Sequence, residues 1–536
     1  MKRPLNSPED VEQWLIDWSE LSAALSEEKA RRYVLHTCNT SDKTLEDAYL
    51  TFEKEIAAPS ARWDHRLNLK FINCPYSQQL SSERYGVLAR AINAEVKIFR
   101  DENVKLNTED TRLCAEYERI TGDMEIEFRG RRLTLEEAQA LLREPDRNLR
   151  EEVWKKIFER WHKDHDKLDE LYGRMVALRH QIAQNAGFRN FRDYTFTKKG
   201  RFDYTPEDCK RLHDAVEKVV VPVARKIVEE RRKALGLQSV RPWDLSVDPL
   251  GRPPLKPYRD VNDLIAKVTA TMRIIDPELA NYVADMAGNG DLDLSARPGK
   301  AGGGYTMSFD RLRRPFIFMN EAGTHRDVMT LFHELGHSFH ALLCRDDPLL
   351  EYRHAPIEFA EVASMGNELF AINHLEDFYT PEDVKRALRD TLEEIILFLP
   401  YCMTVDAFQH WVYLNPSASS AERDQKWAEL SQRFSTGVEW SGFEEIMESG
   451  WHYKSHIFVL PFYYIEYAIS QLGALQLWRK YRENPQDAVF RYKHALSLGG
   501  SRPLPELFAA AGIKFDFSEA LIREVVEDLQ KELAAL

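Results

Sequence analysis

Hydrophobic residues recur along most of the chain with the spacing of an α-helix. Near the N-terminus, apolar side chains fall at i, i+3, i+4, i+7 and i+10, and this stripe predicts one helix with a single buried face. The residues of the stripe are Val11, Trp14, Leu15, Trp18 and Leu21. Ser7 and Pro8 precede it as an N-cap and a first-turn proline. Further along the chain, Thr205 and Asp208 have the spacing of a capping box, which predicts the start of another helix.

Strand-like alternation is rare in this chain. Residues 146–185 form a long charged amphipathic segment, which predicts one long helix or a pair of helices. Residues 125–133 alternate around a possible turn at Arg129 and predict a hairpin, and residues 305–309 and 315–319 predict a second pair of strands. The pattern as a whole therefore predicts a mostly α fold with a small β element in its second half.

The composition is that of an ordinary globular protein. The chain has 536 residues, of which 43% are hydrophobic and 30% are charged, and this balance excludes intrinsic disorder as the main state. At about 150 residues per domain, this length suggests three or four domains or one large unit. The net charge of −14 lacks the basic footprint of a nucleic-acid binder and gives no attraction to an anionic membrane. We expect neither kind of partner.

No segment indicates export or membrane insertion. The first residues, MKRPLNSPEDVEQWL, lack the apolar core of a secretory signal. The longest apolar run, residues 395–403, contains Pro400 and is far shorter than the about 20 residues that a membrane span needs. The six cysteines include no CxxC pair, so we expect neither a disulfide framework nor a cysteine-based zinc site. These features favour a cytoplasmic protein.

The segment His-Glu-Leu-Gly-His, which begins at His333, is the HExxH pattern of zinc hydrolases. A capping box upstream, Thr324 with Asp327, predicts that the segment lies on a helix. On a helix, His333 and His337 share one face, so both can bind one metal ion. Glu334 lies beside that face and can act as general base on a zinc-bound water. Two histidines in an apolar core are the alternative, but buried ionisable groups without partners cost free energy, which favours the metal.

A hydrolytic zinc site needs a third protein ligand and one open position. His340 lies on the same face a full turn beyond His337, so we do not expect it to reach the same ion. The next predicted helix, residues 356–370, offers three glutamates: Glu358, Glu361 and Glu368. If this helix runs antiparallel to the first, Glu361 returns to the histidines, and Glu358 could orient a ligand histidine from behind. Spacing alone leaves these choices open against a solvated helix face.

A second polar cluster lies in residues 451–467, WHYKSHIFVLPFYYIEY. Tyrosine and histidine side chains can donate hydrogen bonds to an oxyanion that forms at a metal-bound carbonyl. The same residues are also typical of an aromatic core helix. The pattern alone leaves both interpretations open.

A glycine run, residues 302–304, leads into the predicted strand at Tyr305. It does not have the spacing of a phosphate-binding loop, because Ala301 follows Lys300 where that loop needs Ser or Thr. An edge strand beside the HExxH helix could instead pair with an extended peptide. Gly303, Gly304 and Tyr305 are therefore candidate substrate-binding residues.

Several of these segments together resemble one known family. The segments PFIFMNEAGTHRDVMTLFHELGHSFH, IEFAEVASMGNE, HIFVLPFYYIEYAIS and ALSLGGSRPLPELFAAAGI are similar to zinc metallopeptidases of the thimet oligopeptidase and oligoendopeptidase F group. The spacing between His333 and Glu361 suits the oligoendopeptidase F branch. The resemblance covers residues 140–536 well, and the first 140 residues only as a helical region.

The resemblance implies a two-lobed, mostly helical fold with a deep substrate channel. It implies an N-terminal helical region over residues 1–140 and a zinc peptidase domain over residues 141–536. It also implies one zinc ion per chain, bound by His333, His337 and Glu361, with Glu334 as the general base.

The resemblance further implies that His456 and Tyr463 stabilise the tetrahedral intermediate, with Tyr464 and Tyr467 as alternatives. The function it implies is a zinc endopeptidase that cuts short oligopeptides, and the sequence indicates no oligomeric state. A zinc carboxypeptidase or dipeptidyl carboxypeptidase on a similar scaffold is one alternative. A non-catalytic, zinc-containing helical binding protein is another, although a structural site would not need Glu334 as a base.

Overall fold

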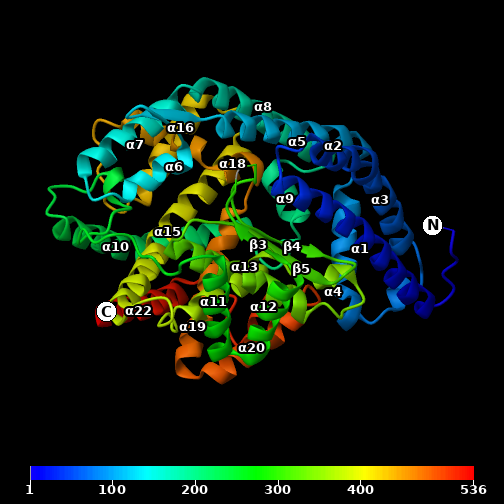
Figure 1. Cartoon of the computed structure of the whole chain (residues 1–536). Helices are drawn as coiled ribbons and strands as arrows, with labels where there is room; N and C mark the ends of the chain where they lie inside the picture. The colour runs from blue at the N-terminus through cyan, green and yellow to red at the C-terminus, as the bar shows by residue number, and fades with distance from the viewer. Residues whose placement is uncertain (1, 298) are drawn as a thin grey trace. The chain divides into compact units, whose positions relative to one another are not determined.

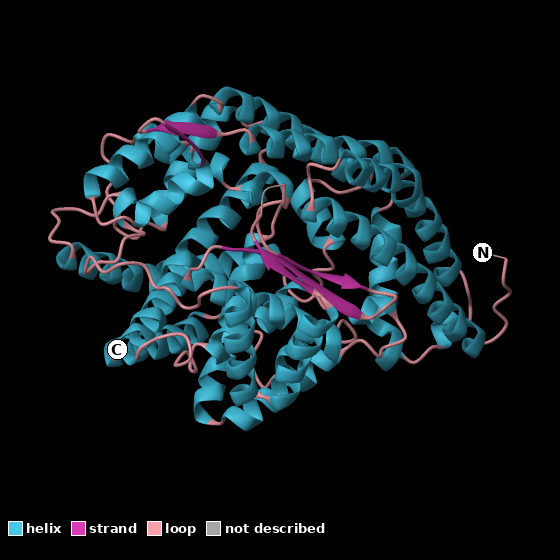
Figure 2. Cartoon of the chain, viewed as in Figure 1, coloured by secondary structure: helices cyan, strands magenta, loops and turns pink. Residues whose placement is uncertain are grey.

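The computed structural model describes residues 2–297 and 299–536, and helices dominate it (Figure 1; Figure 2). The mostly α prediction is confirmed. The chain divides into two compact units, and each unit is assembled from three stretches of sequence. Unit 1 comprises Met1–Phe99, Leu255–Leu388 and Ile469–Asp516. Unit 2 comprises Arg100–Pro254, Arg389–Ala468 and Phe517–Leu536. The predicted boundary at residue 140 and the substrate channel stay predictions.

Unit 1 combines a small sheet with the helices around it. Its strands are β3 (Leu292–Ser295), β4 (Tyr305–Phe309) and β5 (Arg314–Glu321). Its helices are α1 (Pro8–Cys38), α2 (Lys43–Phe52), α3 (Ala58–Ile72), α4 (Ser82–Ile98), α11 (Val261–Ile275), α12 (Pro277–Asn289), α13 (His325–Leu343), α14 (Ile357–Ala371), α20 (Pro485–Ser497) and α21 (Leu504–Ala510).

Unit 2 is helical apart from one hairpin, formed by β1 (Glu125–Phe128) and β2 (Arg131–Thr134). Its helices are α5 (Asp101–Gly122), α6 (Leu135–Ala140), α7 (Arg147–His162), α8 (His165–Asn185), α9 (Phe191–Lys198), α10 (Pro206–Ala234), α16 (Ser420–Arg433), α17 (Glu444–Glu448), α18 (Ser455–Val459) and α22 (Glu519–Ala535). Two helices belong partly to each unit, α15 (Pro381–Leu414) and α19 (Tyr464–Glu483).

The local predictions account for many of these elements. The Ser7 side chain accepts a hydrogen bond from the amide of Asp10 at the start of α1, and the Thr205 capping box begins α10. The predicted hairpin at residues 125–133 is confirmed, and residues 146–185 form a pair of helices, α7 and α8.

The sheet of unit 1 has the strand order β3–β5–β4, so β4 lies at one edge. β4 runs antiparallel to β5, which confirms the second predicted strand pair, and β3 runs parallel to β5. The sequence did not predict β3, which pairs with β5 and not with the next strand along the chain, so no hairpin turn marks it. Phe309 and its neighbours on one face of β4 pack against Ala30 and Val34 of α1. Thr306 faces the other way, because side chains alternate along a strand.

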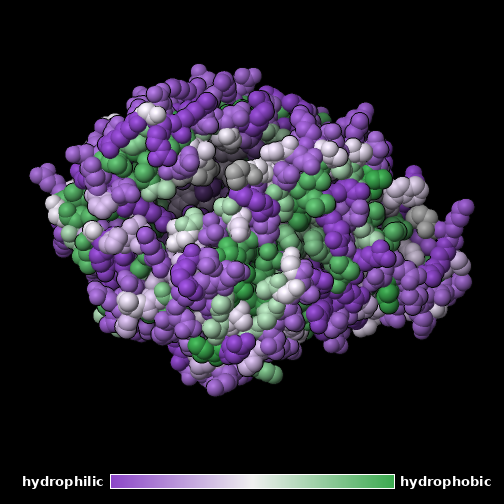
Figure 3. Space-filling model, viewed as in Figure 1, coloured by the Kyte–Doolittle hydropathy of each residue, from purple (hydrophilic) through white to green (hydrophobic). Residues whose placement is uncertain are grey.

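One described helix, α15, is long and apolar enough to cross a membrane by length and composition alone. Of its most apolar 18-residue window, 61% is buried inside the protein. The face drawn in Figure 3 is mostly hydrophilic, with hydrophobic residues in scattered groups.

Candidate functional site

The HExxH helix, α13, begins directly after β5, and its first turn is firmly anchored. Asp327 accepts hydrogen bonds from the amides of Thr324 (2.7 Å) and Ala322 (2.9 Å) and from the hydroxyl of Tyr258 (2.8 Å). The Thr324 hydroxyl in turn accepts from the amide of Asp327, which completes the predicted capping box. These bonds fix where the helix starts relative to the sheet, and therefore which face carries the histidines.

Helix α14 packs antiparallel against α13 at very short range. Asn367 donates a hydrogen bond to the carbonyl of Phe332 (2.7 Å), while Gly336 lies against Ser364, one turn back along α14. A Cβ on Gly336 would lie 2.5 Å from Ser364 Cα and 2.6 Å from the carbonyl oxygen of Ala363. Only glycine permits this approach, so the middle of the HExxH motif sets the spacing between the two helices.

Three side chains converge across this helix pair. His333 Nε2 lies 3.2 Å from His337 Nε2, and Glu361 Oε2 lies 3.3 Å from the former and 3.7 Å from the latter. Two nitrogens bound to one tetrahedral zinc at about 2.0–2.1 Å lie roughly 3.3 Å apart, so these distances match one ion. The donor set of two imidazoles and one carboxylate is also one that zinc uses in catalytic sites. The residues present therefore fit zinc.

Two side chains that hold these three in place were not assigned that role from sequence. Glu368 Oε1 lies 2.6 Å from His333 Nδ1 and fixes the orientation of that ring. Ser364 donates a hydrogen bond to Glu361 Oε2 (3.0 Å). The structure thus gives Glu368 the contact with His333 that the sequence analysis predicted for Glu358. Glu358 is buried on α14, and its contribution to the site stays a prediction.

Helical spacing could have identified Glu368. It follows Glu361 by seven residues, which is two turns along the same face of α14. The contact of Ser364 could not be deduced in this way, because it depends on the rotamer of Glu361.

Glu334 is buried next to the sheet, and a hydrogen bond from β4 holds one oxygen of its carboxylate. Thr306 of β4 donates to Glu334 Oε2 (2.7 Å). The other oxygen, Oε1, lies on the side of Gly304, where a side chain would begin 3.9 Å from it if residue 304 were not glycine. Thr306 therefore orients one carboxylate oxygen, and the other lies on the side of Gly304.

The site carries an excess of carboxylates over fixed positive charge. Burial lowers the pKa of His333, but the hydrogen bonds to Glu361 and Glu368 outweigh burial and hold the pKa well above its ordinary value. Burial lowers the pKa of His337. A divalent cation is the natural counter-charge for such a group.

Other predicted residues near the motif lie outside the ligand group. Burial lowers the pKa of His340 to about 3, and its ring packs against Phe359 instead of joining the two ligand histidines. The hydroxyl of Tyr305 forms a hydrogen bond with Thr37 of α1 (2.6 Å), so it is directed away from the HExxH helix. Gly303 adopts a positive φ of 87° in the turn before β4. Its predicted role in substrate binding, like that of Tyr305, stays a prediction.

The predicted histidine and tyrosine cluster is assembled within unit 2. The ring of His456 lies 5.6 Å from Tyr463, 5.0 Å from Tyr464 and 6.1 Å from Tyr467, measured between ring centres. Burial lowers the pKa of His456 to about 4, so its imidazole is neutral at physiological pH. Burial raises the pKa of Tyr464 far above its ordinary value. His456 and Tyr464 thus keep their N–H and O–H groups as donors.

A strained turn holds this cluster. Phe462 adopts a left-handed conformation with φ of 61°, which is unfavourable for a bulky residue, and its side chain is fully buried. Its amide donates to Gln409 (2.7 Å), and its carbonyl accepts from Arg201. These bonds define the direction in which the chain presents Tyr463, the next residue. Strain of this kind is often found at functional sites.

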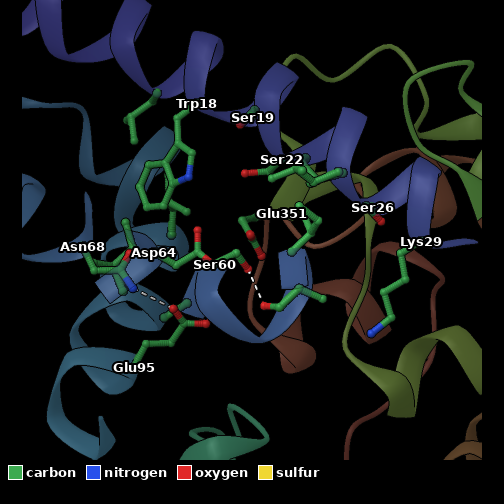
Figure 4. Close-up of a pocket in the computed structure, with 18 of the residues that line it drawn as sticks. Trp18, Ser19, Ser22, Ser26, Lys29, Ser60, Asp64, Asn68, Glu95 and Glu351 are labelled. Atoms are coloured by element: carbon green, nitrogen blue, oxygen red, sulfur yellow. Dashed lines mark hydrogen bonds between the residues drawn. The ribbon is translucent and has the colours of Figure 1, made fainter. Parts of the chain in front are cut away.

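A separate cavity of about 440 Å³ lies in unit 1, between α1, α3 and α4. Figure 4 shows serine and carboxylate side chains around it, among them Ser22, Asp64 and Glu351. None of the predicted site residues lines this cavity, so it does not belong to the HExxH site.

Comparison with known proteins assigns the family. Residues 140–527 match peptidase family M3, and residues 3–99 match the peptidase M3 N-terminal domain. The chain therefore belongs to peptidase family M3. Within it, the similarities below identify the oligoendopeptidase F branch, which confirms the resemblance seen in the sequence.

An oligoendopeptidase F homolog of Borreliella burgdorferi is 24% identical over 88% of this chain and 78% of its own length. The oligopeptidase PepF of Bacillus subtilis is 23% identical over 58% of this chain and 47% of its own length. A solved structure of PZ peptidase A with an inhibitor superposes with a TM-score of 0.93 at 29% identity, covering 99% of this chain and 94% of that one. A structure described as an oligoendopeptidase F from Bacillus anthracis gives 0.88 at 26% identity, covering 99% and 93%.

Proposed function

We propose that this protein is a zinc-dependent endopeptidase that hydrolyses short oligopeptides. The observation that carries the proposal is the convergence of His333, His337 and Glu361 around one point, with Glu334 on the same helix. Membership of peptidase family M3 and the names of the relatives, oligoendopeptidase F and oligopeptidase, support it.

The proposed roles follow from the geometry of unit 1. His333, His337 and Glu361 hold the ion, while Glu368 and Ser364 keep two of these ligands in position. When bound, zinc supplies a Lewis acid that polarises the peptide carbonyl and acidifies the attacking water. Glu334 accepts a proton from that water and delivers it to the leaving amine.

The substrate is proposed to align along β4. The edge of β4 that does not face β5 offers backbone groups to an extended peptide, which is the requirement for β-augmentation. Thr306 of this strand also holds Glu334, so a peptide on the edge strand would pass next to the general base. Folded proteins do not present such an extended backbone, and we therefore expect them to resist cleavage.

The proposed oxyanion donors are His456 and Tyr463, with Tyr464 and Tyr467 as alternatives. Imidazole N–H and phenol O–H donors are suited to charge that develops only in the transition state. The support for this assignment is the family resemblance together with the strained, fixed turn at Phe462.

The zinc-binding assignment is tested by metal content. The natural chain should contain zinc, and chelation should remove both zinc and activity. Glu361→Ala should weaken zinc binding, while Glu334→Gln should retain zinc but lose turnover. Normal zinc binding by Glu361→Ala, together with loss of zinc in Glu358→Ala, would show that the assignment is wrong by one helical turn.

The endopeptidase assignment is tested by the products. A peptide blocked at both ends should be cut internally if the protein is an endopeptidase. A zinc carboxypeptidase or dipeptidyl carboxypeptidase would require a free C-terminus, and a non-catalytic binding protein would cut neither the blocked nor the free peptide.

A further inference from the structure

A second group of side chains that could hold a metal ion lies in unit 2, on two helices that do not include the HExxH motif. Helix α10 contributes Cys209 and His213, and α15 contributes Asp406 and His410. Within each helix the two residues are four positions apart and share one face. The packing of these two faces brings all four side chains together.

The distances separate three ligand candidates from one supporting residue. Ligand atoms of Cys209, Asp406 and His410 all lie within 4.8 Å of one another. His410 Nε2 is 3.3 Å from Asp406 Oδ2, close to the roughly 3.3 Å expected between two ligands of one tetrahedral zinc. His213 Nε2 is only 2.8 Å from the same oxygen, which is a hydrogen-bond distance. His213 therefore orients the carboxylate of Asp406.

Hydrogen bonds within the protein do not satisfy every polar atom of the group around Asp406. Among the described residues, Asp406 Oδ1 and His410 Nε2 are buried atoms without a hydrogen-bond partner. The Asp406 side chain is 0% exposed, and its ion-pair partners in the described chain are His213 and His410, with no lysine or arginine. A buried carboxylate with an unsatisfied oxygen is costly unless a cation is present.

A comparable group in the same unit shows what complete hydrogen bonding looks like. Asp169 accepts hydrogen bonds from His452 (3.0 Å) and Ser420, and His165 lies between Asp169 and Asp424. No atom of these side chains is among the buried unsatisfied atoms of the described chain. Hydrogen bonds and ion pairs therefore satisfy the polar atoms of this group without a metal ion, whereas they leave two atoms unsatisfied in the group around Asp406.

We propose that Cys209, Asp406 and His410 bind a second zinc ion that links α10 to α15, that water takes the fourth position of the tetrahedron, and that His213 orients Asp406. Zinc accepts sulfur, oxygen and nitrogen ligands in one tetrahedral set, while a thiolate disfavours magnesium and calcium. A thiolate and a carboxylate together balance the charge of Zn²⁺, so the occupied site is electrically neutral where it is buried. Binding displaces the thiol proton of Cys209 to solvent.

The position of the site suggests what it stabilises. The ring of His410 packs edge-on against Phe462, with 5.3 Å between ring centres, and the neighbouring Gln409 binds the amide of Phe462. An ion here would tie α10 to α15 directly behind the strained turn that precedes Tyr463. The sequence expectation of no cysteine-based zinc site considered only CxxC pairs, and this site uses one cysteine with ligands from a distant helix.

The first test is the zinc content of a chain whose HExxH site is disabled. The double variant His333→Ala/His337→Ala should retain one zinc ion per chain after dialysis against metal-free buffer, where the natural chain retains two. Adding Cys209→Ser should remove the remaining ion. Adding Cys402→Ser, which changes a buried cysteine on α15 that is not a proposed ligand, should not. A double variant that is folded by circular dichroism but free of zinc would overturn the proposal.

Cobalt gives a second test, and its first measurement is made on the natural chain. In a chain reconstituted with Co²⁺, a thiolate ligand adds an intense sulfur-to-metal charge-transfer absorption in the near ultraviolet. The HExxH group has no cysteine, so this absorption reports the second site alone. The natural chain and Cys402→Ser should show it, and Cys209→Ser should lack it. Its absence from the natural chain at two equivalents of cobalt, or its persistence in folded Cys209→Ser, would contradict the assignment.

Discussion

Gly336→Ala should separate the two helices that carry the proposed zinc ligands. The new Cβ would lie 2.5 Å from Ser364 Cα, 2.6 Å from the Ala363 carbonyl oxygen and 2.9 Å from the Ser364 amide nitrogen. Carbon atoms prefer a separation of about 3.5–4.0 Å, so α14 must move by roughly 1 Å. All three contacts are with backbone atoms, which cannot rotate away as the end of a side chain could.

The expected magnitudes follow from this displacement. Overpacking of this kind lowers the free energy of unfolding by about 1–3 kcal/mol, while the higher helix propensity of alanine raises it by about 1 kcal/mol. Because the contacts are with backbone, we expect a net loss near the upper end, about 2 kcal/mol. Glu361 would move with α14, and a displacement of roughly 1 Å in a catalytic constellation costs about 10²-fold in rate.

The assay combines thermal unfolding, zinc content and kcat/KM on a blocked peptide. Gly86→Ala is the matched control, because Gly86 also lies within a helix of unit 1, α4, and a Cβ there meets no atom within 4 Å. The control should be as stable as the natural chain or slightly more stable, and fully active. If Gly336→Ala unfolds at the same temperature as the control and retains zinc and activity, the reasoning about helix spacing is wrong.

Three further predictions concern single side chains. Glu368→Ala should lower zinc affinity about 10–100-fold, measured by competition with a chelator, because Glu368 fixes a ligand histidine; an unchanged affinity would remove that role. Tyr463→Phe should lower kcat about 10²–10³-fold with little change in KM, and steady-state kinetics that show the loss in Tyr464→Phe instead would transfer the role to that residue. The Asp424 carboxylate raises the pKa of His165 to about 9, above its unfolded value. The stabilisation that this ion pair gives the folded state should be fully present below about pH 6.5 and lost as pH rises through about 9. The free energy of unfolding should then fall by about 1 kcal/mol after allowance for solvent screening. Urea unfolding at both ends of this range checks this, and an equal pH dependence in His165→Gln would refute it.

The sequence predicted residue positions best where a single helix or a short turn determines them. His333 and His337 share a face because of helical periodicity alone, and the capping box at Thr324 fixes the start of their helix. The position of Glu361 needed the family resemblance as well, because three glutamates of α14 fit the spacing. The contact between Glu368 and His333 depends on how α14 is rotated against α13, and that rotation is set by the close approach at Gly336.

Contacts between distant segments could not be predicted in this way. Thr306 holds Glu334 because β4 packs beside α13. β3 pairs with β5, which is not the next strand along the chain, so no local pattern predicts the sheet order. The pairing of Cys209 with Asp406 joins helices far apart in sequence, so neither half of that group indicates the other. Long-range packing, and not local propensity, determines these arrangements.

The most direct test of the central claim compares the natural chain with Glu334→Gln at equal zinc content. Both proteins are incubated with a peptide blocked at both ends, and the products are identified by mass spectrometry. The account predicts internal cleavage by the natural chain and a rate lower by about 10²–10⁴-fold in the variant, because glutamine cannot accept the proton of the attacking water. Equal cleavage by the two proteins, or no cleavage by the zinc-loaded natural chain, would contradict it.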